Sequence, residues 1–384
     1  MFACRIRSLR ALDRISEDAQ FRDNWCVLSR ARSETVVCSH QMTNVLGAID
    51  PDELAGLLPE CVRTLQRRKQ LQDAVLLGHW MVVSDGTGIF SSATYHCQRC
   101  LTQTHQDGSK TYLHNVLEAK VITWDGLALS LMSEMQLNPE DGSYDKQDCE
   151  SKAFRRLLAR LKQTFPQQRI VHLLDSGYCY GPTFKAIEDA HHAFICCFKP
   201  GSIPTLYEEA LTLCARNPQQ RVVQKLAIEG HCVHREYTWV NDLDYQGLCL
   251  AFVLCKETVN GKASTFAWLT DFAVDRDNVI TIGQGGRKRW TIENEGFNVQ
   301  KTGYALEHFC DCKDLQAMTC LYLLLQIAHL FMQLLARSNL IEPVSTLAFL
   351  AELLLEAWRN LPLSNDLFAP DQPRIQVRLA RGPT

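Results

Sequence analysis

The stretch "VVSDGTGIF", residues 82–90, decides how the chain is interpreted. An apolar run leads directly into Asp85, and Gly-Thr-Gly follows it. We expect a buried strand over residues 78–84 that closes on the carboxylate of Asp85. A carboxylate in that position must be paired, bind a metal or take part in chemistry, because burying an uncompensated charge is costly.

A second apolar segment ends in the same way. "RIVHLLDSGY", residues 169–178, places Asp175 after an apolar run and before Ser-Gly. Sites in α/β sheets form outside the ends of strands, and two carboxylates there repel each other unless a cation lies between them. Mg²⁺ prefers such oxygen ligands. Taken singly, Asp85 and Asp175 are each equally well explained as turn residues.

A third acid is expected in "RKRWTIENEGFNVQKTGY", residues 287–304. On a helix Arg289 and Glu293 share one face, because they are four residues apart. Glu295 points about 200° away from Glu293, so both cannot face one metal ion. We favour Glu293 over Glu295, and a plain helix-surface acid is the alternative for Glu293 alone.

The surrounding segments predict an α/β fold with a mixed sheet flanked by helices. Residues 148–164 read as a helix capped by Asp148, and strand and helix patterns alternate to residue 199. Residues 221–283 carry alternating β-branched stretches, including "VITIG" (279–283), and an Asn-Gly hairpin signal. Helical patterns resume near Arg287 and continue to about residue 360.

This reading divides the chain into four parts. They are a helical N-terminal region (1–74), a catalytic domain (75–199 and 284–340), a β-rich insertion (200–283) and a C-terminal helix and tail (341–384).

Composition favours a soluble, cytoplasmic protein with reduced thiols. The chain has 384 residues, 46% of them hydrophobic, and its 17 cysteines are scattered rather than regularly spaced. The first 20 residues do not resemble a secretory leader, and the apolar run at 320–335 is shorter than the roughly 20 residues needed to cross a bilayer. The net charge is −3, but basic clusters at 63–69, 152–162 and 287–289 could contact phosphates.

"SDGTG", "LLDSGY" and "RWTIENEGFN..KTGY" together resemble the three acidic motifs of DDE transposases from bacterial insertion sequences. The last motif is similar to the Tyr–Arg–Glu–Lys signature of the large family with a β-strand insertion before the Glu. "WLTDF" (268–272) also resembles that family. The resemblance covers about residues 75–335 and implies a ribonuclease-H-like catalytic domain.

The resemblance implies a DNA transposase that cleaves and joins phosphodiester bonds at insertion-sequence ends. Asp85, Asp175 and Glu293 would be the catalytic triad and would bind two Mg²⁺ ions, with Mn²⁺ as a substitute. The DNA contacts would come from four basic side chains, Arg287, Lys288, Arg289 and Lys301. The implied partners are transposon ends and target DNA, with a homodimer acting at the nucleoid and no membrane contact.

The chain departs from the family at two positions. Gly286 stands where the family has Tyr, and Lys301 lies one residue beyond the family's Lys position, which is Gln300. Only 84 residues precede Asp85, a short allowance for an N-terminal DNA-binding part. The short N-terminal part and the absent Tyr motivate an alternative, a degraded or captured copy that binds DNA without cutting it. A third class is a glycoside hydrolase that uses Asp85 and Asp175 as acid and base.

"HCQRC", residues 96–100, contains the pair Cys97 and Cys100, with His96, His105 and His114 nearby. A tetrahedral zinc ion needs two further ligands, which "HFCDC" (308–312) could supply. Structural zinc at Cys97 and Cys100 is therefore possible, but a hairpin turn with buried thiols is favoured. "DKQDCE" (145–150) is interpreted mainly as a capped helix start, with a supporting role near the metal as the alternative for Asp145, Asp148 and Glu150.

Overall fold

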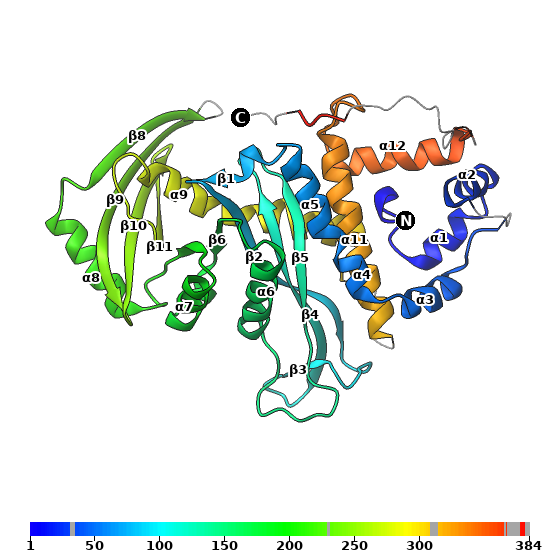
Figure 1. The fold of residues 1–384 in the computed structure, drawn as a ribbon, viewed down its shortest axis with the longest axis horizontal. Coiled ribbons are helices and arrows are strands. Elements are labelled where there is room, and N and C mark those ends of the chain that lie inside the picture. Colours follow the sequence, from blue (N-terminus) through cyan, green and yellow to red (C-terminus); the bar gives the residue numbers. More distant parts are fainter. Residues whose placement is uncertain (31–34, 229–230, 308–313, 365, 367–376, 381–384) are drawn as a thin grey trace.

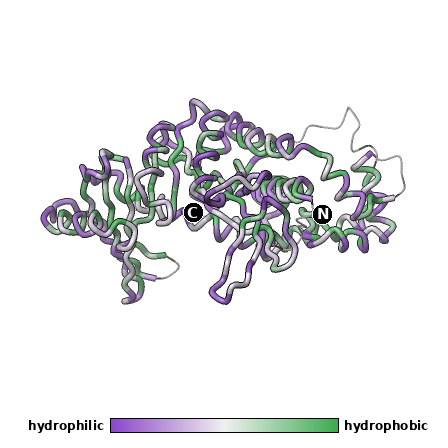
Figure 2. Tube along the Cα trace, turned by 90° about the horizontal axis from the view of Figure 1, so that it is seen from below, coloured by the Kyte–Doolittle hydropathy of each residue, from purple (hydrophilic) through white to green (hydrophobic). Residues whose placement is uncertain are grey.

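One mixed β-sheet runs through most of the protein, and a group of helices lies beyond one end of it (Figure 1). The structure is a computed structural model that describes residues 1–30, 35–228, 231–307, 314–364, 366 and 377–380. In Figure 1 the long helix α11 (Leu315–Ala336) stands between the sheet and helices α1 (Leu9–Ile15) and α2 (Ala19–Ser29), whereas α5 (Leu57–Arg67) lies on the sheet side of α11. Hydrophobic residues gather within these layers and hydrophilic residues mostly toward the outside (Figure 2).

Eleven strands in the described residues belong to this one sheet. In chain order they are β1 (Val75–Leu76), β2 (His79–Ser92), β3 (Leu101–Thr104), β4 (Lys110–Ile122), β5 (Ala128–Gln136), β6 (Ile170–Leu174), β7 (Ala193–Cys197), β8 (Arg221–Ile228), β9 (His231–Tyr245), β10 (Leu248–Val259) and β11 (Lys262–Thr270).

The sheet is mixed in direction, which confirms the expected α/β class. Strands β2, β4 and β5 form an antiparallel meander, whereas β6 pairs parallel to β2 and β7 parallel to β6. Strand β11 then pairs antiparallel to β7, and β10, β9 and β8 follow outward. The β-rich segment therefore extends the central sheet through β7.

The remaining elements are helical. The α-helices are α1 (Leu9–Ile15), α2 (Ala19–Ser29), α3 (Ser39–Ala48), α4 (Pro51–Ala55), α5 (Leu57–Arg67), α6 (Glu150–Thr164), α7 (Gly181–Asp189), α8 (Pro204–Arg216), α9 (Val279–Arg287), α10 (Asn298–Tyr304), α11 and α12 (Leu347–Asn360). Short 3₁₀ turns are η1 (Phe2–Cys4), η2 (Gln72–Ala74), η3 (Ser176–Tyr178) and η4 (Lys288–Trp290), and η5 (Ile292–Phe297) is a π-helical turn.

Helices cover both faces of the sheet. On β7, Phe194 stacks on Phe184 of α7, with ring centroids 4.4 Å apart. The next residue, Ile195, points toward α9, since its Cδ1 would lie 3.6 Å from a Cβ atom added at Gly285. Because successive strand residues point to opposite faces, α7 and α9 lie on opposite sides of the sheet.

A buried polar network joins strands β4 and β5 to helix α11. Lys120 on β4 is fully buried and donates to Ser130 Oγ at 2.5 Å and to Gln326 Oε1 at 2.8 Å. Its neighbour Glu118 accepts from Tyr322 Oη at 2.7 Å. Burial lowers the pKa of Lys120 despite the Glu118 carboxylate 3.7 Å away. Polar groups that are satisfied in this way fix how α11 sits on the sheet.

The hairpin expected from the Asn-Gly signal is confirmed: the Asn260-Gly261 turn joins β10 to β11 with positive φ at both residues. The apolar run at 320–335 lies in the mostly buried helix α11. Helix α11 is the one described helix long and apolar enough to cross a membrane by length and composition, and 61% of its apolar window is buried in the protein.

Two boundary expectations were wrong. Strand β2 does not stop at Asp85 but continues to Ser92, because β4 pairs with it past the Gly-Thr-Gly run. Asp148 does not cap α6: its carboxylate accepts from the Leu137 amide and from Arg156 instead. The stretch 200–283, expected to be β-rich, holds the four strands β8–β11 together with helix α8 and the start of α9.

"VITIG" is the start of helix α9 rather than a strand. Its β-branched residues favour a strand locally, but glycines further along the helix allow very close packing. A Cβ atom on Gly286 would lie 2.3 Å from Trp268 Nε1. A side chain as large as tyrosine could not stand at position 286, because Trp268 fills the space.

Gly286→Ala is expected to destabilise the protein by about 1–3 kcal/mol through overpacking against Trp268. Alanine's higher helix propensity, about 1 kcal/mol, offsets only part of this. Urea unfolding of the variant measures the change, with Gly201→Ala as the control because nothing lies within 4 Å of its added Cβ. Equal stability of the two variants would contradict the packing argument.

Candidate active site

The register of the parallel strands β2 and β6 brings Asp85 and Asp175 together. Val83 pairs with Leu173, and each acid lies two residues further along the chain: Asp85 within β2, and Asp175 in extended backbone directly after β6. Residues two apart on a strand point to the same face, so both acids leave the sheet on one side. The negative charge of Asp175 is one of the influences that raise the pKa of Asp85.

Asp85 is partly buried among other charges. Its Oδ1 accepts from the Gly86 amide at 3.0 Å. Burial, the largest cause, and the charges of three neighbouring acids, Glu150, Glu293 and Asp175, together raise the pKa of Asp85 to about 7, against the opposing effect of Arg289. A carboxyl group with such a perturbed pKa, beside specific charged partners, is a functional-site candidate.

The turns η4 and η5 bring Arg289 and Glu293 to Asp85. Arg289 Nη1 lies 2.8 Å from Glu293 Oε1 and 3.6 Å from Asp85 Oδ2, and only 7% of the Arg289 side chain is exposed. The guanidinium also lies over the Trp290 ring, 4.3 Å from its centroid. Glu295 lies elsewhere, lining a pocket with Gly126 and Gln333. Glu293, as favoured from the sequence, is therefore the acid that the fold places beside Asp85.

A fourth carboxylate, Glu150, completes the acidic cluster. It begins helix α6, and a Cβ atom on Gly86 would lie only 2.5 Å from Glu150 Oε2. Tyr178 Oη donates to Glu150 Oε1 at 2.5 Å. Burial raises the pKa of Glu150, the Tyr178 hydrogen bond opposes this, and the charge of Asp175 adds to it.

Sequence reasoning gave Glu150 mainly a structural role and did not single out Tyr178. The signal for Tyr178 was available, because it lies three residues after Asp175 in the same motif. Glycine at 86 was a weaker signal for Glu150, since it marks a close approach by another part of the chain. Asp145 is exposed, and Asp148 pairs with Arg156 at 2.7 Å, so neither joins the cluster.

The other basic residues predicted to contact DNA do not contact the acidic cluster. Arg287 pairs with Glu257 at 2.6 Å, and Lys301 pairs with Glu307 at 2.7 Å. Lys288 donates to the Trp124 carbonyl at 2.5 Å. Of the four predicted basic residues, Arg289 is the one that the described contacts bring to the acids.

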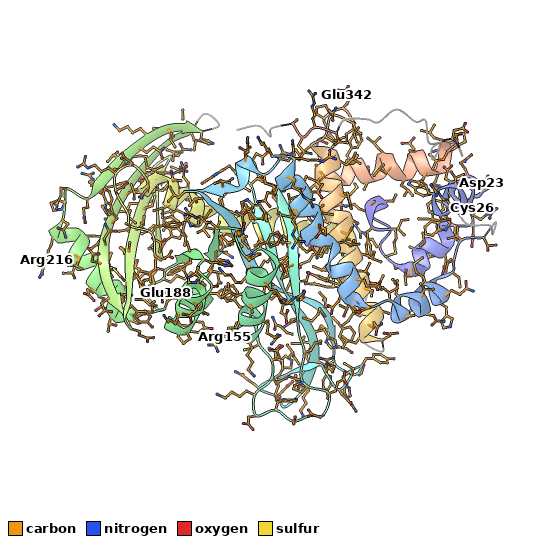
Figure 3. All side chains as sticks on the ribbon, in the orientation of Figure 1. Asp23, Cys26, Arg155, Glu188, Arg216 and Glu342 are labelled. Carbon is orange, nitrogen blue, oxygen red and sulfur yellow. The ribbon has the colours of Figure 1, made fainter. Side chains whose placement is uncertain are left out.

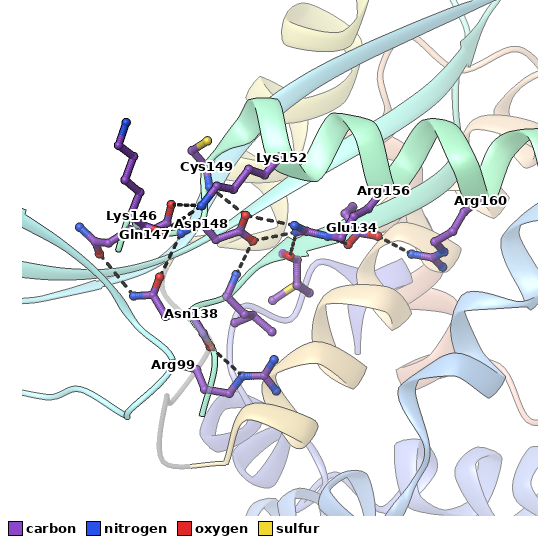
Figure 4. Close-up of polar contacts among 12 residues, drawn as sticks. Arg99, Glu134, Asn138, Lys146, Gln147, Asp148, Cys149, Lys152, Arg156 and Arg160 are labelled. Atoms are coloured by element: carbon purple, nitrogen blue, oxygen red, sulfur yellow. Dashed lines mark hydrogen bonds and ion pairs between the residues drawn. The ribbon is translucent and has the colours of Figure 1, made fainter. Parts of the chain in front are cut away.

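The basic cluster on α6 divides into engaged and exposed residues. Arg156 and Arg160 both bind Glu134, at 2.6 and 2.8 Å, in the network of Figure 4. Arg155 is exposed and points away from the body of the protein (Figure 3). Part of this helix face is therefore open to an anionic partner.

The acidic cluster has the donor chemistry of a hard-cation site. The cluster holds four carboxylates, from Asp85, Glu150, Asp175 and Glu293, and Arg289 pairs with two of them, Asp85 and Glu293. Oxygen donors are those that Mg²⁺ prefers. A cation there would lower the raised pKa of Asp85, because opposite charge favours the ionised form. The carboxylate oxygens are spaced widely: among the described residues, only Cys97, Cys100 and His114 hold possible ligand atoms all within 4.8 Å of one another.

No protein-family model matches the chain, and no curated protein shows significant sequence similarity to it.

Proposed function

We propose that the protein is a metal-dependent DNA transposase that cleaves and joins phosphodiester bonds through Asp85, Asp175 and Glu293. The observation that carries the proposal is the register of β2 and β6, which sets Asp85 and Asp175 side by side where Arg289 and Glu293 reach them. The order of the acids along the chain and their motifs agree with the resemblance to DDE transposases.

A ribonuclease-H-like core is part of the proposal. The sheet order β5-β4-β2-β6-β7, with β4 antiparallel to its neighbours and β6 and β7 parallel to β2, supports it. Helices on both faces fit such a core. The strands β8–β11 precede Glu293 in the chain, where the related transposases carry their insertion.

The π-helical turn η5 supports the assignment of Lys301. A π-helical turn accommodates one extra residue, and Lys301 lies one residue beyond its expected spacing from Glu293. Gln300 is buried and bonds to Gln326 and His329, whereas the Lys301 side chain is 39% exposed. Position 301 is therefore the one available to a phosphate.

In phosphoryl transfer the acidic residues would bind metal ions and the basic residues would bind phosphate. Asp85, Asp175 and Glu293 would hold divalent ions, with Glu150 as a further carboxylate at the same place. Bound Mg²⁺ or Mn²⁺ would activate the attacking oxygen and stabilise the leaving oxygen. Arg289 keeps Asp85 and Glu293 close together and presents a guanidinium suited to bidentate phosphate binding. Tyr178 orients Glu150.

Glu293→Gln and Asp175→Asn are expected to reduce Mg²⁺-dependent cleavage of a transposon-end DNA at least about 100-fold, because loss of even a ligand's hydrogen-bond partner costs about 10–100-fold. Glu295→Gln is the matched control and should cleave like the wild type, since Glu295 lies in a different pocket. The readout is end nicking on a labelled duplex with Mg²⁺ or Mn²⁺.

The nicking assay, together with DNA binding and sugar hydrolysis, separates the competing functions. Loss with Glu295→Gln but not with Glu293→Gln would refute the assignment of the third acid. A wild type that binds end DNA and never nicks it would support a binding-only copy. Sugar hydrolysis that survives EDTA would support a glycosidase instead.

A further inference from the structure

The loop between β2 and β3 gathers two cysteines and a histidine outside the acidic cluster. Cys97 and Cys100 come from this loop, and His114 comes from β4. The two sulfur atoms are 3.7 Å apart. His114 Nε2 lies 3.3 Å from Cys97 Sγ and 3.2 Å from Cys100 Sγ.

These distances match one tetrahedral zinc ion. With Zn–S near 2.3 Å and Zn–N near 2.0 Å, a tetrahedron separates two sulfurs by about 3.8 Å and a sulfur from a nitrogen by about 3.5 Å. Two thiols that pack only as apolar groups have no need to converge on one imidazole nitrogen. The sulfur separation also shows that the pair is not a disulfide, which requires about 2.05 Å.

The backbone of the loop is arranged around the same point. The Cys97 amide lies 3.3 Å from Cys100 Sγ and donates to it, and the Cys100 amide donates to the Cys97 carbonyl at 3.3 Å. Amide donors to a ligand sulfur stabilise its thiolate form and orient it. His96, beside this turn, stacks on Tyr112 of β4 at 4.1 Å.

Burial distinguishes the three ligands and leaves a side for a fourth. Cys100 and His114 are buried, whereas Cys97 is half-buried. Water can therefore reach the group from the Cys97 side. Cys310 and Cys312, suggested from the sequence as further ligands, lie outside the described residues.

The loop is tied to the segment that leads into α6. Asn138 Nδ2 donates to the Cys100 carbonyl at 2.8 Å, and the Asn138 amide donates to the Arg99 carbonyl at 3.1 Å. Asn138 Oδ1 in turn accepts from the Asp148 amide at 3.0 Å, two residues before Glu150 (Figure 4). A fixed cysteine loop would thus help to fix the start of α6.

We propose that Cys97, Cys100 and His114 supply three of the ligands of a structural zinc ion that fastens the β2–β3 loop to β4 and to the segment before α6. The ion would hold together a loop that otherwise depends on a few hydrogen bonds. The proposal is independent of DNA chemistry, because metal content and loop protection are measured without DNA.

The test measures metal in protein purified under reducing conditions without added zinc. We expect about one zinc per chain in the wild type and in Cys249→Ser, an exposed cysteine on β10. Cys97→Ser and His114→Gln should bind zinc at least about 100-fold more weakly. Zinc retained at full occupancy by Cys97→Ser would overturn the assignment.

A second measurement covers variants that fail to fold. Wild-type protein stripped by a chelator is titrated with Co²⁺, which should give the visible bands of a tetrahedral thiolate site and lose them on addition of zinc. Stripping should also increase protease cleavage within residues 93–100 and 137–149, and zinc should reverse this. A wild type that is metal-free and gives no tetrahedral cobalt spectrum would refute the site.

Discussion

Asp85→Asn is expected to abolish Mg²⁺-dependent DNA cleavage and at the same time to make the protein more stable near pH 8. The pKa of Asp85 is raised to about 7 in the folded protein, against 3.8 for an ordinary aspartate. The difference corresponds to at most about 4 kcal/mol. Partial exposure of the side chain makes a gain of about 2–4 kcal/mol the expected result at pH 8.

The sign of this effect sets its pH dependence. Because the folded state binds the Asp85 proton more tightly than the unfolded state, wild-type stability falls as the pH rises from about 4 to about 7. The stabilisation of Asp85→Asn should therefore be full above about pH 7 and vanish toward pH 4. Urea unfolding at several pH values measures it, and Mg²⁺ should stabilise the wild type more than the variant.

Asp271→Asn is the matched control for Asp85→Asn. Desolvation also raises the pKa of Asp271, to about 6, but Asp271 is exposed and accepts from the Phe194 amide near the beginning of β7, away from the acidic cluster. Asp271→Asn should show a smaller pH-dependent gain in stability, because solvent screens an exposed charge, and it should keep full cleavage activity. An Asp85→Asn variant that is less stable at pH 8 and still cleaves DNA would refute the role assigned to Asp85.

Lys120→Met is expected to destabilise the protein by about 3–5 kcal/mol. Lys120 and Glu118 are both fully buried, and removing one partner leaves the other as an uncompensated buried charge. The change also removes donors to Ser130 and Gln326. Urea unfolding of the variant measures the loss.

The double variant Glu118→Gln/Lys120→Met should recover part of that stability, because no unpaired charge remains. Lys185→Met is the surface control: Lys185 also pairs with two acids, Glu188 and Asp189, but in solvent, so little or no change is expected. If the buried and surface variants lost the same stability, the network would have no structural importance.

The pairing of Asp85 with Asp175 could be predicted from the sequence because two apolar segments each lead into an acid. The reason given for Asp85 was nevertheless incomplete. Strand β2 continues past it, and what ends there is its parallel pairing with β6, after Val83 and Leu173. Local sequence does not show which neighbour a strand pairs with at each residue.

Neither the position of Glu150 in the acidic cluster nor the helical start of α9 could be predicted from the sequence. Glu150 reaches the cluster because the segment before α6 is held by Asn138 and Asp148, a tertiary arrangement without a sequence pattern. The β-branched residues of α9 favour a strand, but close packing of Gly283 and Gly286 against Tyr237 and Trp268 selects a helix. Tertiary contacts override local propensity in both places.

Strand β11 hydrogen-bonds to β7, and helix α9 packs on Tyr237 of β9 and Trp268 of β11. The outer strands β8–β11 therefore support the helix that leads to Arg289 and Glu293. Excising residues 204–278 would expose the edge of β7 and remove the surface on which α9 packs, so that Arg289 and Glu293 would lose their support. Strands β8–β11 and the segment that carries Glu293 thus form a single structural unit, which a chimera would have to exchange together.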